Sequence, residues 1–153
     1  MKKSVIVLVL FSFSLILNAQ NNNQKEKFQP TFEKSKNAVE DGNYQFIAEL
    51  VFDDETREKV SSTFNKLTID ETIIIGELGL LKGSDDQSLP INGTIQNKIL
   101  NIDDEQQRVL IAFDVSSGMD VYNCSFRIMP NGRCFLKVRM PNGYNISYVG
   151  KIK

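Results

Sequence analysis

The tetrapeptide Met-Pro-Asn-Gly occurs twice in this chain, at residues 129–132 and 140–143, eleven residues apart. Proline suits the second position of a type I turn, asparagine the third, and glycine the left-handed residue that follows. Each copy therefore predicts a hairpin with a three-residue loop and a bulge. With such loops Met129 pairs with Arg133 and Met140 pairs with Tyr144. The two turns predict a three-stranded antiparallel meander in the last third of the chain.

This register places the even-numbered residues of all three strands on one face. They are almost all apolar: Tyr122, Cys124, Phe126, Ile128, Cys134, Leu136, Val138, Met140, Tyr144, Ile146, Tyr148 and Ile152. A two-residue loop would put these sets on opposite faces and bury charge, which the pleat of a half-buried sheet does not tolerate. We therefore predict that this face points into the core.

The same register sets the separation of the two cysteines. Cys134 lies opposite Ile128, and Cys124 lies four residues further along that strand, about 13 Å away at a rise of about 3.3 Å per residue. A disulfide needs Cα atoms within roughly 7 Å of each other. Although proteins outside the cytoplasm often contain disulfides, we predict two reduced cysteines that face the core and pack as small apolar side chains.

The odd-numbered face of the meander is basic and contains no acid. Its basic side chains are the candidate binding residues Arg127, Arg133, Lys137, Arg139 and Lys151. Six basic residues and one acid follow residue 118, a net charge of +5, whereas residues 20–118 hold ten basic and eighteen acidic residues, a net charge of −8. One interpretation is a surface that binds an anionic glycan, a lipid headgroup or an acidic protein. The other is a solvated face, or one that meets the acidic remainder of the chain, whose charges prevent aggregation.

The N-terminus has the pattern of a signal peptide. Two lysines precede an apolar run from Val5 to Leu17, and the small Ala19 suits cleavage. The run is shorter than the roughly 20 residues that a helix needs to cross a bilayer, and no comparable run follows it. We therefore expect residues 1–19 to be a signal peptide and the mature protein to be periplasmic or extracellular, with no transmembrane segment.

The middle of the chain predicts a short helix followed by strands. Residues 20–27 are uniformly polar and are expected to form a flexible leader. Thr31 is a candidate N-cap for one short helix, and Gly42 marks its end. A half-buried strand is expected next, with alternate residues on one side: Tyr44, Phe46, Ala48, Leu50 and Phe52.

Further strands are expected around residues 67–69 and 73–75, at a start or edge near Pro90, and over residues 109–115. Residues 28–153 are therefore expected to form a single, mainly β (α+β) domain. A short N-terminal helix would precede about seven antiparallel strands, folded as a β-sandwich or a partly closed barrel that ends in the meander.

The composition excludes several classes of chemistry. The chain has no histidine and no tryptophan, so Ser-His-Asp triads, Cys-His pairs and histidine zinc sites are excluded. It also lacks a glycine-rich phosphate loop, a GxSxG turn and a CxxC pair. We therefore predict no enzyme, no cofactor, no catalytic residue and no metal ligand. The mature net charge of −3 favours no nucleic-acid partner.

Two other functions stay open beside a non-enzymatic binding or envelope-associated module. A small barrel would hold an apolar ligand among the aromatic rings of Tyr122, Phe126, Tyr144 and Tyr148. Carboxylates at residues 53–55, 85–86 and 103–105 could serve as acid and base of a hydrolase. None of these acidic clusters has the spacing of an EF-hand loop, and solvated turns explain them adequately.

Four stretches carry a resemblance to known proteins: residues 46–48, residues 89–93 with their Leu-Pro and nearby glycine, the Gly132 turn, and the closing Ile-Ser-Tyr-Val-Gly-Lys-Ile at 146–152. From about Tyr44 to Ile152 the chain resembles a family of small exported bacterial proteins known only as a domain of unknown function, the one numbered 4251. That family usually has an aromatic residue where Ile91 stands. The resemblance implies an exported, mainly β domain after a short helix, and it implies no activity, cofactor or catalytic residue.

Overall fold

The computed structural model describes residues 25–83 and 88–153 of the chain. The expected signal peptide, residues 1–19, and residues 20–24 of the expected leader lie outside the described residues. Ten strands are described, and their bounds are β1 Asn43–Phe52, β2 Arg57–Lys59, β3 Lys66–Asp70, β4 Ile73–Gly79, β5 Ser88–Pro90, β6 Gly93–Asp103, β7 Arg108–Ser117, β8 Asp120–Ile128, β9 Arg133–Arg139 and β10 Asn145–Ile152.

Residues 25–40 are helical, so the helix extends further upstream than expected. Residues 25–27, expected in a flexible leader, are helical. Thr31, expected as the N-cap, lies inside the helix, and its carbonyl accepts the hydroxyl of Ser35. The first residues of the helix are polar and show no apolar periodicity. The spacing of apolar residues therefore predicted only the later part of the helix, which is buried against the barrel. The predicted end is confirmed, because Gly42 has a φ of 76° and its N–H reaches the carbonyl of Val39 at 3.2 Å.

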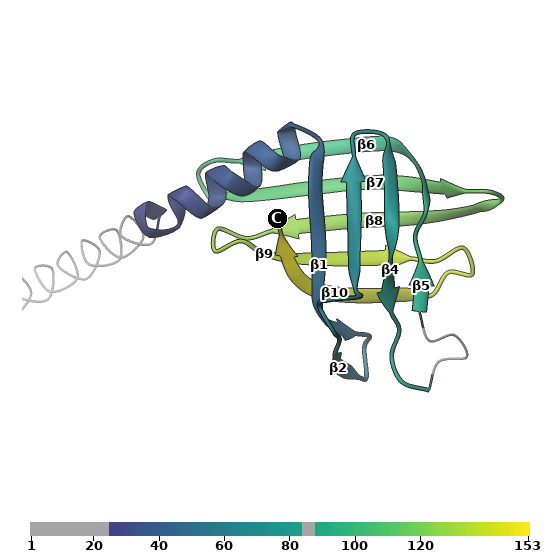
Figure 1. Ribbon diagram of the computed structural model, residues 1–153. Helices are drawn as coiled ribbons and strands as arrows, with labels where there is room; N and C mark the ends of the chain where they lie inside the picture. The colour runs from purple at the N-terminus through teal and green to yellow at the C-terminus, as the bar shows by residue number, and fades with distance from the viewer. Residues whose placement is uncertain (1–24, 84–87) are drawn as a thin grey trace, which may run out of the picture.

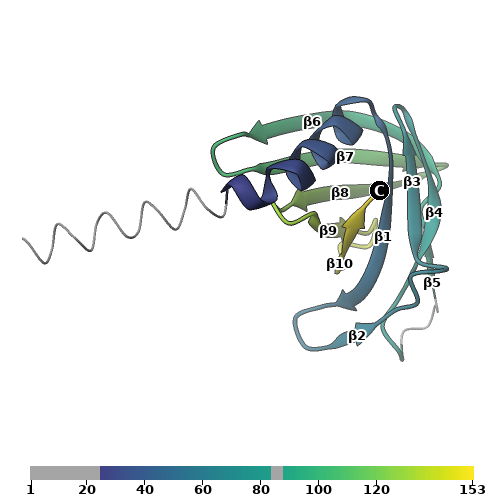
Figure 2. The ribbon, with the colours of Figure 1, turned by 60° about the vertical axis from the view of Figure 1, so that its left-hand side comes forward.

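Eight of the strands close into an antiparallel barrel. They follow the order β1-β3-β4-β6-β7-β8-β9-β10, and β10 pairs back with β1. The two short strands are additions, since β2 pairs with the end of β1 and β5 with the end of β4. In Figure 1, β6 to β10 run nearly perpendicular to β1, β3 and β4, and Figure 2 shows the two groups as facing walls. The predicted fold class is confirmed, with the barrel fully closed.

The C-terminal meander has the predicted register. Met129 and Met140 each donate their N–H to the carbonyl of the residue across the loop, Arg133 and Tyr144, at 2.8 Å. The glycines of the two turns have φ angles of 77° and 87°, in the left-handed region. The even-numbered residues of the three strands face the core, as predicted, except that Tyr144 lies exposed at the strand start.

The barrel is filled by side chains from both walls. The Phe126 ring lies 5.6 Å from Phe46, 5.7 Å from Phe113 and 6.5 Å from Tyr44, measured between ring centroids. Both cysteines are free and buried, as predicted. Their separation follows from the pairing, because Cys134 lies opposite Ile128 while Cys124 lies opposite Val138.

The predicted inward face of strand β1 is wrong in the second half of the strand. In β1, Tyr44, Phe46 and Ala48 point inward, but the next buried side chain of the alternation is Val51 rather than Leu50 or Phe52. The register against β10 shifts between Ala48 and Leu50, so one extra residue is inserted there. Such a bulge reverses the side of every residue that follows it.

The long strand β6 was not predicted as a strand of its own. Most of its side chains are exposed, and only Ile95 is fully buried. Its pairing with β7 is interrupted between Gln96 and Ile99, where Asn97 has a φ of 53°. An exposed strand with an irregularity at its centre shows no alternation of apolar and polar residues, so its sequence carries no strand signal.

The helix packs against one end of the barrel (Figure 2). Phe32 and Val39 are buried in the same core cluster as the barrel side chains. At the first helical turn, the side chain of Gln107 donates from Nε2 to the carbonyl of Lys25 at 3.0 Å. Lys36 binds Asp104 at 2.8 Å. These contacts fasten the helix to the β6–β7 turn.

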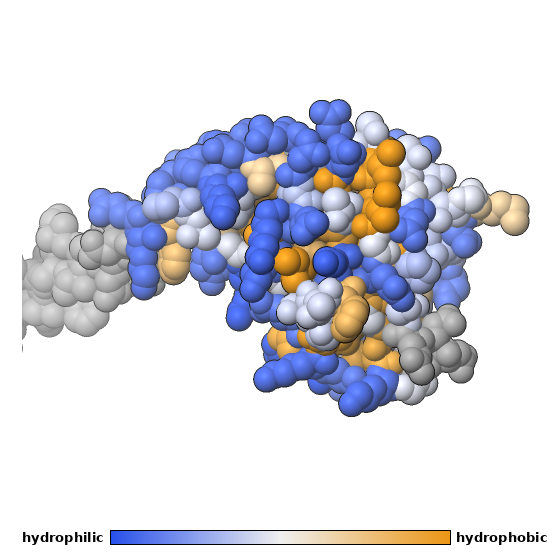
Figure 3. All heavy atoms as spheres, in the orientation of Figure 1, coloured by the Kyte–Doolittle hydropathy of each residue, from blue (hydrophilic) through white to orange (hydrophobic). Residues whose placement is uncertain are grey.

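Figure 3 shows the wall formed by β1, β3 and β4 together with the helix. This side is mostly hydrophilic. Apolar side chains gather over the upper part of β4, where Ile73 and Ile75 are exposed. The predicted binding residues belong to the other wall.

Candidate functional site

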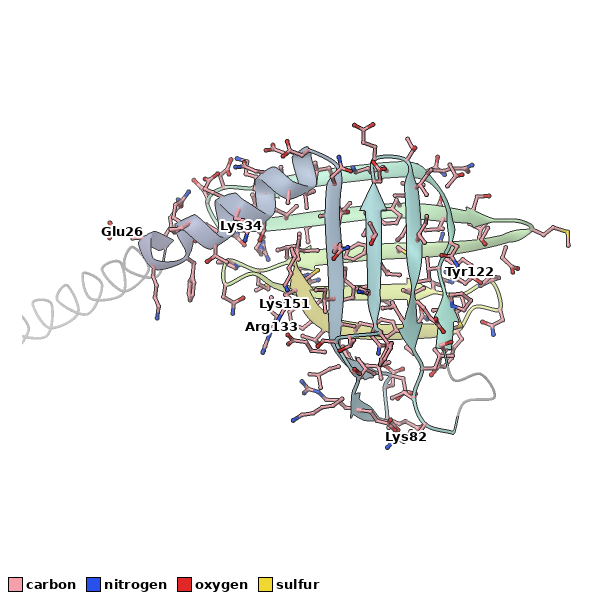
Figure 4. All side chains as sticks on the ribbon, in the orientation of Figure 1. Glu26, Lys34, Lys82, Tyr122, Arg133 and Lys151 are labelled. Atoms are coloured by element: carbon pink, nitrogen blue, oxygen red, sulfur yellow. The ribbon has the colours of Figure 1, made fainter. Side chains whose placement is uncertain are left out.

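Strand pairing arranges the odd-numbered side chains of β8, β9 and β10 in rows. The rows are Asn123, Arg139 and Asn145; Ser125, Lys137 and Ser147; Arg127, Phe135 and Val149; and Arg133 with Lys151. Every row contains a basic residue, so all five predicted binding residues share the outer side of this wall, and all five are exposed. We call these five residues the basic face. Figure 4 shows two of its members, Arg133 and Lys151, lying beside each other.

Most of the basic face has no anionic partner within residues 25–83 and 88–153. Lys151 binds the Oε1 of Glu49 at 3.0 Å. Among the residues that the structure describes, the other four members form no ion pair. Within the described part of the chain, the interpretation that this face meets the acidic remainder therefore holds for Lys151 alone.

One carboxylate lies beside the first row, on the neighbouring strand β7. Asp114 pairs with Asn123, and its Oδ1 accepts the side-chain amide of that residue at 2.7 Å. Its Oδ2 accepts the amide of Asn97, also at 2.7 Å. These two hydrogen bonds, that from Asn97 first, hold the pKa of Asp114 below its ordinary value. Asp114 is thus ionised at neutral pH and is already engaged by neutral donors.

Large apolar side chains lie on the same outer surface. The exposed fraction is 68% for Ile99, 39% for Leu110 and 39% for Phe135. They line a groove of about 530 Å³ that runs from β6 to β10 and also contains Arg127 and Lys137. We call it the sheet groove. The basic face therefore borders an apolar surface formed by Ile99, Leu110 and Phe135, which we call the apolar floor.

A second groove lies between the start of the helix and the turns that follow β6 and β8. Its volume is about 790 Å³, and Phe28, Met129 and Arg133 line it. We call it the helix-end groove. Phe135 lines both grooves, so the two adjoin at this ring.

Sequence reasoning located the basic face but missed both grooves. The sequence contains one indication of an apolar outer surface. Phe135 is an aromatic residue at an outward position of β9, between Arg133 and Lys137. Ile99 and Leu110 join it only because β6 and β7 are placed beside β8, and a single strand pattern contains no information on that neighbourhood.

The four aromatic residues proposed to hold an apolar ligand do not gather around one cavity. Phe126 and Tyr148 are buried in the packed core. Tyr122 is half-buried near the start of β8 (Figure 4). Tyr144 is exposed, and its hydroxyl donates to Asp53 at 3.0 Å. Burial raises the pKa of Tyr148 far above its ordinary value, so this phenol remains neutral.

The two acidic clusters that the structure describes, at residues 53–55 and 103–105, stabilise turns. Asp53 accepts the backbone N–H groups of Glu55 and Thr56, at 2.9 and 2.7 Å, and these bonds lower its pKa. Asp103 accepts the N–H of Gln106 at 2.8 Å in the same way. Residues 85–86 lie outside the described residues. Within the described chain, no three acidic or cysteine side chains are grouped as a metal site would require.

Comparison with known proteins places the chain in a family. Residues 26–152 match the model of a family described as "Domain of unknown function (DUF4251)". The chain belongs to the DUF4251 family. This membership confirms the resemblance that the sequence motifs indicated.

The DUF4251 barrel is also similar to a solved structure. A crystal structure of a DUF4251 family protein from Bacteroides eggerthii superposes with a TM-score of 0.69 and 10% sequence identity, over 79% of this chain and 85% of that chain. At this identity the likeness shows a shared fold alone. No curated protein matches the chain. The described residues contain no helix with the length and apolarity needed to cross a membrane.

Proposed function

We propose that this DUF4251 protein is an exported, non-enzymatic module that binds an anionic partner through its basic face. The observation that carries the proposal is that Arg127, Arg133, Lys137 and Arg139 form no ion pair within residues 25–83 and 88–153. Acids outnumber bases by eighteen to ten over residues 20–118. None of the acids within residues 25–83 and 88–118 forms an ion pair with these four side chains. Clustered charges of one sign raise the local concentration of ligands with the opposite sign.

Export is supported by the N-terminal pattern of two lysines, an apolar run and Ala19. Outside the cytoplasm the anionic partners within reach are carboxylated glycans, lipid headgroups and acidic protein surfaces. An exposed cationic sheet face has the accessibility that binding any of them requires.

The proposal is tested with the purified mature protein and polygalacturonate, a carboxylated glycan, by calorimetry. We expect binding at about 0.02 M salt that weakens strongly at about 0.3 M salt, because screening shortens the reach of exposed charges. Replacing Arg127, Lys137 and Arg139 together by Gln is expected to weaken binding about tenfold or more. These side chains are exposed, so the unfolding temperature should change little.

The matched control replaces Arg57, Lys59 and Lys66 by Gln. These exposed residues of β2 and β3 lie outside the basic face, and the change in net charge is identical. The control is expected to bind within about twofold of the unchanged protein. Equal losses in both triple variants would show that net charge alone acts, and an absence of binding to anionic probes at low salt would refute the proposal.

A further inference from the structure

The outer surface of a sheet wall normally carries polar side chains, and here three large apolar residues interrupt it. Strand pairing places Leu110 opposite Arg127, and Arg127 opposite Phe135. Ile99 lies one row away, opposite Ala112. The guanidinium group of Arg127 is therefore flanked on both sides by exposed apolar surface.

Cationic groups are grouped with this apolar surface. Lys137 is two residues from Phe135 on β9, so both side chains point outward, and Lys137 pairs with Ser125. Neither Arg127 nor Lys137 forms an ion pair with a described residue. An occupant of this surface must supply a negative charge and an apolar body together.

The shape of the surface limits the occupant further. The sheet groove extends over six strands, from Ile99 on β6 to Phe52 on β1, which is about 24 Å at a strand spacing of about 4.8 Å. The adjoining helix-end groove continues from Phe135 to Phe28 and Met129. Both volumes lie within the range of roughly 300–1,000 Å³ that small-molecule sites occupy. A path of this length accommodates an extended alkyl chain.

We propose that the sheet groove binds a monomeric, single-chain anionic amphiphile of the fatty-acid type. This inference rests on the proposed function and names its ligand class. The alkyl chain lies over Leu110 and Phe135, and the carboxylate is bound by Arg127 and Lys137. A carboxylated glycan would leave the apolar floor without a partner. The volume of the groove suits one small molecule rather than a bilayer surface.

The first test uses the unchanged mature protein with probes kept below their micelle concentrations: dodecanoate, octanoate, dodecyltrimethylammonium and polygalacturonate. We expect dodecanoate to bind, and each methylene removed to weaken binding about two- to fourfold, in line with the free energy of burying one methylene. Dodecyltrimethylammonium has an alkyl chain one carbon longer and the opposite charge, and it is expected to bind at least about tenfold more weakly.

The second test separates the apolar floor from the charge. Replacing Leu110 and Phe135 together by Ser is expected to weaken dodecanoate about tenfold or more while leaving polygalacturonate binding within about twofold. Replacing Arg127 and Lys137 by Gln should weaken both. The matched control replaces Ile73 and Ile75, two exposed residues of the other wall, by Ser and should change neither.

The outcomes distinguish the two proposals. Polygalacturonate binding without chain-length dependence, or dodecanoate binding unchanged by the Leu110 and Phe135 substitutions, would overturn the amphiphile inference and leave the anionic partner standing. Binding to vesicles of anionic lipid with no binding of monomeric dodecanoate would also overturn it. Binding of neither anionic probe would overturn both. If the serine variant does not fold, the probe series on the unchanged protein decides the question by itself.

Discussion

The two cysteines show how position governs the chemistry of a side chain. Both thiols face the core of the barrel, in positions with less than 3% of their surface exposed. Burial, with a smaller contribution from Asp114, raises the pKa of Cys124 to about 12. Burial also raises the pKa of Cys134. The nucleophilic thiolate is therefore almost absent at neutral pH, and the cysteines act as packing residues.

This role predicts how Cys134 responds to substitution. Serine keeps the size of the side chain but buries a strongly hydrated hydroxyl, so Cys134→Ser is expected to lower the free energy of unfolding about 1–3 kcal/mol more than Cys134→Ala. Urea denaturation measures both. An exposed serine of the adjacent strand β8 provides the control, since Ser125→Ala should change stability by less than about 0.5 kcal/mol. Equal stability of the serine and alanine variants would contradict a buried apolar environment.

The two hairpin turns have the same sequence but different tertiary contacts. Gly132 and Gly143 have the same left-handed conformation, with φ angles of 77° and 87°. A Cβ at Gly143 would meet nothing within 4 Å, whereas a Cβ at Gly132 would lie 2.9 Å from the Cγ2 of Thr31 on the helix. The first turn therefore supports the helix as well as the hairpin.

We predict that Gly143→Ala lowers the free energy of unfolding by about 1–2 kcal/mol, the cost of a left-handed alanine. Gly132→Ala should lower it by about 1 kcal/mol more, because the helix must also move. The excess should disappear when Thr31 is first replaced by Ser, which lacks the Cγ2 atom. A double-mutant cycle in urea measures this coupling, and a coupling near zero would show that helix and turn are independent.

At the scale of the whole molecule, stability depends on the seam between the first and last strands. Gly150 pairs with Ala48 across this seam, and a Cβ there would lie 2.0 Å from the carbonyl oxygen of Ile47. Beyond it, Gln45 and Lys153 exchange two backbone hydrogen bonds of 2.9 Å. The barrel closes only because its first and last strands, β1 and β10, approach each other this closely.

Gly150→Ala is therefore expected to destabilise the protein by about 3 kcal/mol or more, well beyond Gly143→Ala, which serves as the matched glycine control. Urea denaturation gives the total loss. Amide hydrogen exchange at Gln45 and Lys153 locates it, because opening of the seam should expose these groups first. Unchanged protection of both amides would mean that closure does not depend on the absence of a side chain at this position.

Local sequence was sufficient for the last third of the molecule. The repeated turn sets loop length, loop length sets register, and register sets which side chains are buried. The inward cysteines and the outward basic residues follow from that one pattern, because alternation in a strand is a property of consecutive residues.

Tertiary structure decided what depends on residues far apart in the chain. The bulge that turns Leu50 outward forms where β1 meets β10, and β6 is a strand because β7 and β4 pair with it. Likewise, of the five residues of the basic face, Lys151 is the one that binds a carboxylate in the described part of the chain. The apolar floor exists because Ile99, Leu110 and Phe135 come from three different strands. Such features depend on the contacts between segments, which no periodicity within one segment encodes.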